Sequence, residues 1–104
     1  MAADYAAEHG ENLSGVILLA AYPTKKLADS LEELQVIGSE DRVINRRRLE
    51  HGRAYASAQC TIHVLEGGNH AQFGSYGTQR GDGTARITMM EQVRETVHVI
   101  VERL

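Results

Sequence analysis

The hydrophobic and polar positions along the chain follow a helical period in some segments and a strand period in others. Residues 1–9 place alanines on one face and acidic side chains on another, which predicts a helix that stops at Gly10. Residues 15–21 form a continuous apolar run, which indicates a strand buried on both faces because a strand with one wet face alternates. Residues 60–65 alternate and are rich in β-branched side chains, so they predict another strand.

The segment between these two strands combines two patterns. Residues 30–33 have the spacing of a helix capping box, whereas residues 34–37, directly before Gly38, have the composition of a short strand. We expect a short helix that leads into a strand. Further along, Asn45 predicts the N-cap of a helix that runs to about Ala56. Its outer positions are Arg46, Arg47, Arg48 and Arg53, and its expected inner contacts are Leu49 and Tyr55.

The last helix has the clearest pattern in the chain. Residues 88–91 form a capping box, and apolar residues then recur at alternating spacings of three and four. These residues are Met90, Val93, Val97, Ile100 and Leu104. We expect this stripe, with Met89 beside it, to pack against the rest of the protein.

The predicted order is helix, strand, helix, strand, helix, strand, long loop and helix. Strands separated by helices of this length form parallel sheets through right-handed crossovers. We therefore expect one α/β domain over residues 1–104, with a three-stranded parallel sheet and flanking helices. Residues 67–83 contain six of the ten glycines, and a loop this long in a compact domain is typical of a functional segment.

Composition narrows the possible partners. The 11 basic and 14 acidic side chains give a formal charge of −3, so no basic field favours nucleic acid. The apolar runs are too short to span a bilayer, and the first residues do not have the pattern of a signal peptide, which favours a cytoplasmic protein. Five histidines without paired ligand spacing and a single cysteine, Cys60, predict neither a metal site nor another cofactor.

Two residues with catalytic chemistry follow the ends of predicted strands. Asp41 comes after the second strand and His70 after the third. Because parallel strands deliver their carboxyl ends to one edge of a sheet, the two side chains can meet there. A carboxylate fixes the tautomer of a histidine that takes a proton from a nucleophile. The alternative is structural, since an aspartate after a strand also serves as a turn or helix cap.

Three segments resemble the second half of an α/β-hydrolase-fold protein, most closely the bacterial group related to dienelactone hydrolases. They are residues 15–23, 37–41 and 66–74, and the glycine-rich residues 76–83 extend the last of them. In that family the catalytic triad follows the order serine, acid, histidine. The resemblance therefore implies Asp41 as the acid, His70 as the base and a small carboxylic ester or related acyl compound as the substrate.

The chain departs from that family at the nucleophile. No Gly-x-Ser-x-Gly elbow occurs, and residues 1–9 resemble the remainder of the helix that the elbow opens. The resemblance thus implies a partial domain without its nucleophile-bearing N-terminal half and without the oxyanion hole, so the chain alone should be inactive. A second departure is that Glu32 and Glu33 stand where the family has apolar residues, which predicts a short or displaced middle strand.

Other features favour structural roles or self-association. We interpret the arginine run 46–48 as a solvated helix face and Cys60 as a small buried hydrophobe. The competing hypothesis for function is a non-catalytic α/β domain that binds a partner or its own copies. The apolar run 15–21 lacks the lysines or bulges that protect a sheet edge, so it predicts a homodimer or larger homo-oligomer formed through that edge.

Overall fold

A computed structural model describes residues 2–10, 13–74 and 80–103 of the chain. Three parallel strands form one sheet in the order β1 (Gly15–Leu19), β2 (Glu32–Gly38) and β3 (Gln59–Leu65). The helices are α1 (Ala2–His9), α2 (Arg46–Gly52) and α3 (Met89–Arg103), with short 3-10 turns η2 (Arg53–Tyr55) and η3 (Ala71–Phe73). The predicted α/β class and three-stranded parallel sheet are confirmed.

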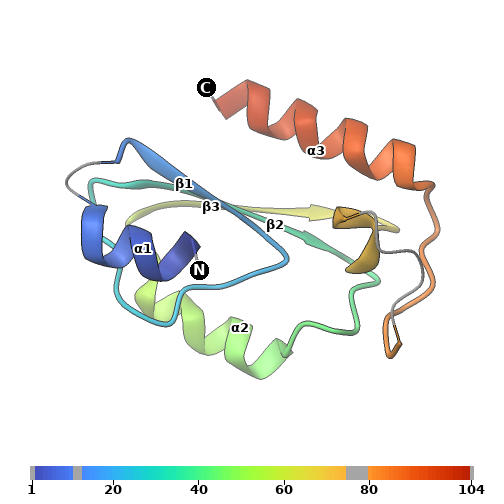
Figure 1. Cartoon of the computed structure of the whole chain (residues 1–104), viewed down its shortest axis with the longest axis horizontal. Coiled ribbons are helices and arrows are strands. Elements are labelled where there is room, and N and C mark those ends of the chain that lie inside the picture. Colours follow the sequence, from blue (N-terminus) through green and yellow to red (C-terminus); the bar gives the residue numbers. More distant parts are fainter. Residues whose placement is uncertain (1, 11–12, 75–79, 104) are drawn as a thin grey trace.

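Helices cover both faces of this sheet, with α3 on one side and α1 and α2 on the other (Figure 1). The alternation along β2 explains the two layers, because Leu34 and Val36 face α3 while Glu33, Gln35 and Ile37 face the opposite side. On the α3 side the buried residues are Leu34, Val36 and Leu65, with Phe73, Val99 and Ile100 packed against them. On the other side Ala6, Leu27 and Leu31 are buried beneath Ala7, Leu13 and Val16.

The middle strand differs from the sequence expectation. Residues 20–31, which connect β1 to β2, contain no helix; β2 begins at Glu32 and has seven residues, as many as β3. The expected short or displaced strand is therefore wrong. The physical reason is that Glu33, although buried, has partners: one carboxylate oxygen accepts the Ser57 N–H at 2.8 Å and the other accepts Gln35 Nε2 at 2.5 Å. A buried carboxyl group with these contacts does not interrupt the strand.

The first strand also differs from its prediction. It ends at Leu19, and Ala20 follows with φ 52°, a left-handed conformation that is uncommon outside glycine. β1 is an edge strand in this sheet, and Ile17 and Leu19 are each 39% exposed. The expected burial on both faces is therefore wrong, because α3 leaves the β1 side of its face open.

The two later helices have the predicted caps, whereas their packing differs. In α2, Asn45 Oδ1 accepts the Arg48 N–H at 3.0 Å, and α2 together with η2 covers the predicted range. Tyr55, which was expected to be an inner contact, is exposed.

In α3 the capping box is confirmed, with Thr88 and Glu91 bonded reciprocally at 2.9 and 3.0 Å. The residues that α3 buries are Gln92 and Thr96. The expected packing stripe is instead largely exposed at Met89, Met90, Val93 and Val97.

Within the described ranges, no helix is both long and apolar enough to cross a membrane.

Candidate functional site

Asp41 and His70 lie together beyond the carboxyl ends of β2 and β3. The Nδ1 atom of His70 is 2.8 Å from Oδ2 of Asp41, which is the contact that the sequence predicts. The Asp41 side chain has no exposed surface, while that of His70 is 26% exposed. The pair thus combines a buried carboxylate with a histidine whose side chain is partly exposed.

The loop after β2 holds the Asp41 carboxylate in place. Its Oδ1 accepts the backbone N–H groups of Val43 and Ile44, each at 2.9 Å. Asp41 therefore also forms the turn that the sequence allows as its structural role, and the same side chain both holds the turn and contacts His70. The guanidinium of Arg46 donates to the Asp41 carbonyl at 2.8 Å and to the Gly38 carbonyl at 3.4 Å. The interpretation of Arg46 as only a solvated helix residue is therefore incomplete.

The hydrogen bonds of Asp41 set the direction of the contact with His70. Since a carboxylate oxygen can only accept, we expect Nδ1 of His70 to carry the proton and to donate it to Oδ2 of Asp41, while Oδ1 accepts the two backbone N–H groups. That tautomer leaves Nε2 with a free lone pair. No hydroxyl or thiol among the described residues hydrogen-bonds to this ring. The exposed side of His70 can therefore accept a proton from a group that approaches from outside.

Asp82 fixes the loop of His70, a role that the sequence analysis does not assign. Its Oδ1 accepts the backbone N–H of His70 at 3.3 Å and that of Arg42 at 3.3 Å, and its Oδ2 accepts the N–H of Ala71 at 2.9 Å. Gly83 donates to Oδ1 as well. Burial acts to raise the pKa of Asp82, but these backbone donors outweigh it and hold the pKa below its ordinary value. One carboxylate thus joins the loop of the acid to the loop of the base.

The two loops approach each other closely at a pair of glycines. A Cβ on Gly38 would overlap the carbonyl oxygen of Gly68, which no side chain can tolerate without backbone movement. The Gly68 carbonyl accepts the Glu40 N–H at 2.8 Å, and Ser39 Oγ accepts the Gly67 N–H at 2.8 Å. The absence of side chains at the two glycines therefore allows the loop before Asp41 and the loop before His70 to share hydrogen bonds.

Gln92 of α3 anchors the base loop from the other side. Its Oε1 accepts the Asn69 N–H at 3.1 Å and Gln72 Nε2 at 2.8 Å, and its own Nε2 donates to the Asn69 carbonyl at 2.9 Å. Asn69 directly precedes His70. The apolar pattern of α3 does not indicate that Gln92 is buried. Its side-chain amide is the one feature of the sequence that indicates a hydrogen-bonding role.

Cys60 does not belong to this site. It lies near the start of β3, whereas His70 follows the end of that strand. Burial, followed by the repulsion of the nearby Glu33 carboxylate, raises the pKa of the Cys60 thiol to about 11. A thiol with this pKa is almost entirely protonated near neutral pH, so Cys60 is a poor substitute for a nucleophile.

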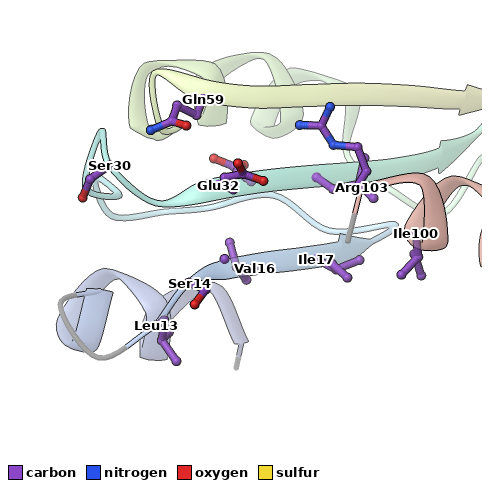
Figure 2. Close-up of a pocket in the computed structure, with 12 residues that line it drawn as sticks. Leu13, Ser14, Val16, Ile17, Ser30, Glu32, Gln59, Ile100 and Arg103 are labelled. Carbon is purple, nitrogen blue, oxygen red and sulfur yellow. The ribbon is translucent and has the colours of Figure 1, made fainter.

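A pocket lies at the amino ends of the strands (Figure 2), whereas Asp41 and His70 follow the carboxyl ends of β2 and β3. Its volume is about 850 Å³, and its walls come from the amino ends of β1 and β2 and from the last turns of α3. Ile17, Leu34 and Ile100 supply apolar surface, while Glu32 and Arg103 supply charges. Among the described residues no group of three histidine, cysteine or acidic side chains could hold a metal ion.

The three-stranded parallel sheet with flanking helices agrees with a comparison of the chain with known families. The model of the alpha/beta hydrolase family matches residues 1–94. The chain belongs to this family. No curated protein and no solved structure matches it.

Proposed function

We propose that the chain carries the acid and the base of a hydrolytic triad, as in the dienelactone-hydrolase-related group, and that its substrate class is a carboxylic ester or related acyl compound. The observation that supports this proposal most directly is the 2.8 Å contact between His70 Nδ1 and the fully buried Asp41. A buried carboxylate that holds one tautomer of a partly exposed histidine is the arrangement used for proton transfer in acyl chemistry.

In the proposed reaction a hydroxyl group from outside this sequence attacks the carbonyl carbon of the ester. His70 Nε2 takes the hydroxyl proton as the carbon–oxygen bond forms, and the imidazolium then gives that proton to the departing alkoxide as its bond to carbon breaks. Water completes the turnover by the same two transfers. Asp41 keeps the Nδ1–H oriented and stabilises the transient imidazolium without taking the proton itself.

The chain alone should be a weak catalyst. A positioned general base contributes a factor of about 10² to 10⁴ in favourable cases, and here the sequence contains no nucleophile elbow, whose following residue would supply an oxyanion donor. We expect hydrolysis of activated esters to proceed near the rate of free imidazole.

The experiment supplies the missing nucleophile as a small alcohol. The release of p-nitrophenol from p-nitrophenyl acetate is measured with the full chain at increasing methanol concentration, together with methyl acetate formation. We expect a methanol-dependent rate that falls to the background in His70→Ala and persists in the control His51→Ala, which removes an exposed histidine of α2.

A normal solvent isotope effect in D₂O should accompany the methanol-dependent rate, because general-base catalysis moves a proton in the transition state. A rate that survives His70→Ala, or a burst that leaves an acetyl group on Cys60, would contradict the proposed roles.

A further inference from the structure

The pocket at the amino ends of the strands opens on the face of the sheet that α3 covers (Figure 2). Leu34 packs in the α3 layer, and Ile17 lies beside Leu34 in the register. Glu32 lies on the same face because it is two residues before Leu34, and Gln59 lies beside Glu32 in the register. These four side chains form the floor of the pocket.

The opposite wall of the pocket comes from the last turns of α3, through Ile100 and Arg103. Gly15 keeps the floor open beside Glu32, since a Cβ at Gly15 would come within 2.9 Å of the Glu32 carbonyl oxygen. The volume of about 850 Å³ falls within the range of about 300–1,000 Å³ that is typical of sites for small molecules. The space is therefore large enough for a small ligand.

The pocket contains two oppositely charged side chains that are available to a ligand. Glu32 and Arg103 both line it, and neither side chain forms a hydrogen bond or an ion pair with another described residue. Glu33 also lines the pocket, but its carboxylate oxygens already accept two hydrogen bonds. Figure 2 shows the guanidinium of Arg103 on the same side of the pocket as Glu32, whereas Ile17 and Ile100 lie on the other side. The pocket thus has a polar end with both signs of charge and an apolar end.

We propose that this pocket binds a small zwitterion with an apolar body, which is the chemistry of a free apolar amino acid or a short apolar peptide. The ligand carboxylate pairs with Arg103, whose planar guanidinium can donate two parallel hydrogen bonds. The ligand ammonium pairs with Glu32. The apolar body lies against Ile17, Leu34 and Ile100.

The two charges select this ligand over simpler ones. A fatty acid would pair only with Arg103 and an apolar amine only with Glu32, so each would leave one charge of the pocket without a partner.

Other occupants of this side of the protein would not fill the polar end of the pocket. A strand added to the free edge of β1 lies on the side of β1 away from β2, whether it comes from the half-domain that the resemblance implies or from a second copy. Glu32 of β2 and Gln59 of β3 would stay uncovered in both cases. The inference also does not depend on the proposed triad, because Asp41 and His70 follow the carboxyl ends of the strands.

The first test is an NMR titration of the ¹⁵N-labelled full chain with leucine and, separately, with leucyl-leucine, which distinguishes a free amino acid from a peptide as the ligand. We expect saturable shifts of the backbone amides in residues 14–17 and 32–34. For leucine, the matched compounds with a single charge are 4-methylpentanoate and 3-methylbutylamine. For leucyl-leucine, they are N-acetyl-leucyl-leucine and leucyl-leucinamide.

Each matched compound should bind about fivefold more weakly than its zwitterion, which is the upper end for the loss of one exposed ion pair. Glycine, which lacks the apolar body, should not saturate the site. The absence of a saturable shift with both zwitterions, or equal binding of the compounds with a single charge, would overturn the proposal.

The second test removes each charge from the protein. Glu32→Gln and Arg103→Gln should each raise the dissociation constant of the zwitterion about fivefold. The controls are Arg94→Gln, on the opposite side of α3 from Arg103 at about 100° per residue, and Glu102→Gln, and both should leave the constant unchanged. His70→Ala should also leave it unchanged, which separates this site from the proposed triad. Circular dichroism verifies the fold of each variant. Unaltered binding in Glu32→Gln and Arg103→Gln, or equal weakening in the controls, would refute the assignment.

Discussion

Replacing Asp41 separates its two roles, because its two oxygens have different partners. Oδ1 accepts the N–H groups of Val43 and Ile44, and Oδ2 accepts Nδ1 of His70. Asp41→Asn keeps a carbonyl oxygen for the two backbone donors and places an amide opposite the ring. Asp41→Ala removes all three contacts. The two variants should therefore differ in the free energy of unfolding and in the tautomer of His70.

The magnitudes follow from the burial of each partner. Asp41→Asn replaces a hydrogen bond to a charged group, worth about 1.5–3 kcal/mol, with a neutral one in which the amide donates to the ring, so its cost lies below that range. Asp41→Ala loses this hydrogen bond in full. Asp41→Ala also leaves the buried Ile44 N–H without an acceptor and the more exposed Val43 N–H dependent on water, about 1–3 kcal/mol for each unsatisfied donor. We expect a total of about 3–6 kcal/mol for Asp41→Ala, a large part of the 5–15 kcal/mol that is typical of a domain.

Urea unfolding followed by circular dichroism measures these differences, and ¹⁵N-detected NMR of the histidine ring identifies the tautomer. In the wild type the proton should reside on Nδ1 of His70. In Asp41→Asn it should move to Nε2, because the amide then donates to Nδ1, and the methanol-dependent ester cleavage should disappear with it. An Asp41→Ala variant no less stable than Asp41→Asn, or an unchanged tautomer in Asp41→Asn, would refute this reasoning.

Three further changes test the surroundings of the pair. Asp82→Asn should lower the free energy of unfolding near neutral pH, as measured by urea titration. Because folding lowers the pKa of Asp82, this loss of stability should be present above the ordinary pKa of about 4 and should disappear as pH falls through the lower pKa of the folded state. Cys60 should react with iodoacetamide at pH 8 roughly a hundredfold more slowly than an ordinary thiol, measured by mass spectrometry, because its pKa is about 11. Gly38→Ala should lower the urea midpoint strongly, since its Cβ would meet the Gly68 carbonyl, and NMR should show the Nδ1 proton of His70 exchanging faster with water.

The helices whose caps are formed by nearby residues could be predicted from the sequence, and so could the contact between Asp41 and His70. The capping atoms of Asn45 and Thr88 lie within three residues of their partners, so their effect is visible in the sequence. The contact between Asp41 and His70 followed from topology, since successive parallel strands end at one edge.

The remaining features depend on partners far away in the chain. Glu33 continues a strand because Ser57, 24 residues later, donates to it. The buried face of α3 is set by Gln92, whose partners lie in the loop of Asn69. Asp82 binds the backbone of Arg42, 40 residues earlier. Periodicity reports only which residues are apolar, and these three polar side chains carried no local signal of burial or of partner.

The amide of Gln92 acts as a surrogate peptide group, because it gives Asn69 both an acceptor and a donor, as a neighbouring strand would. Glutamate at this position would set a carboxylate oxygen against the Asn69 carbonyl, methionine would offer neither function, and asparagine would be one methylene too short. Tolerance to substitution at position 92 should therefore be narrower than at the apolar positions around it, although α3 is an outer helix. In a library of α3 variants, position 92 should therefore accept fewer amino acids than the apolar positions of the helix.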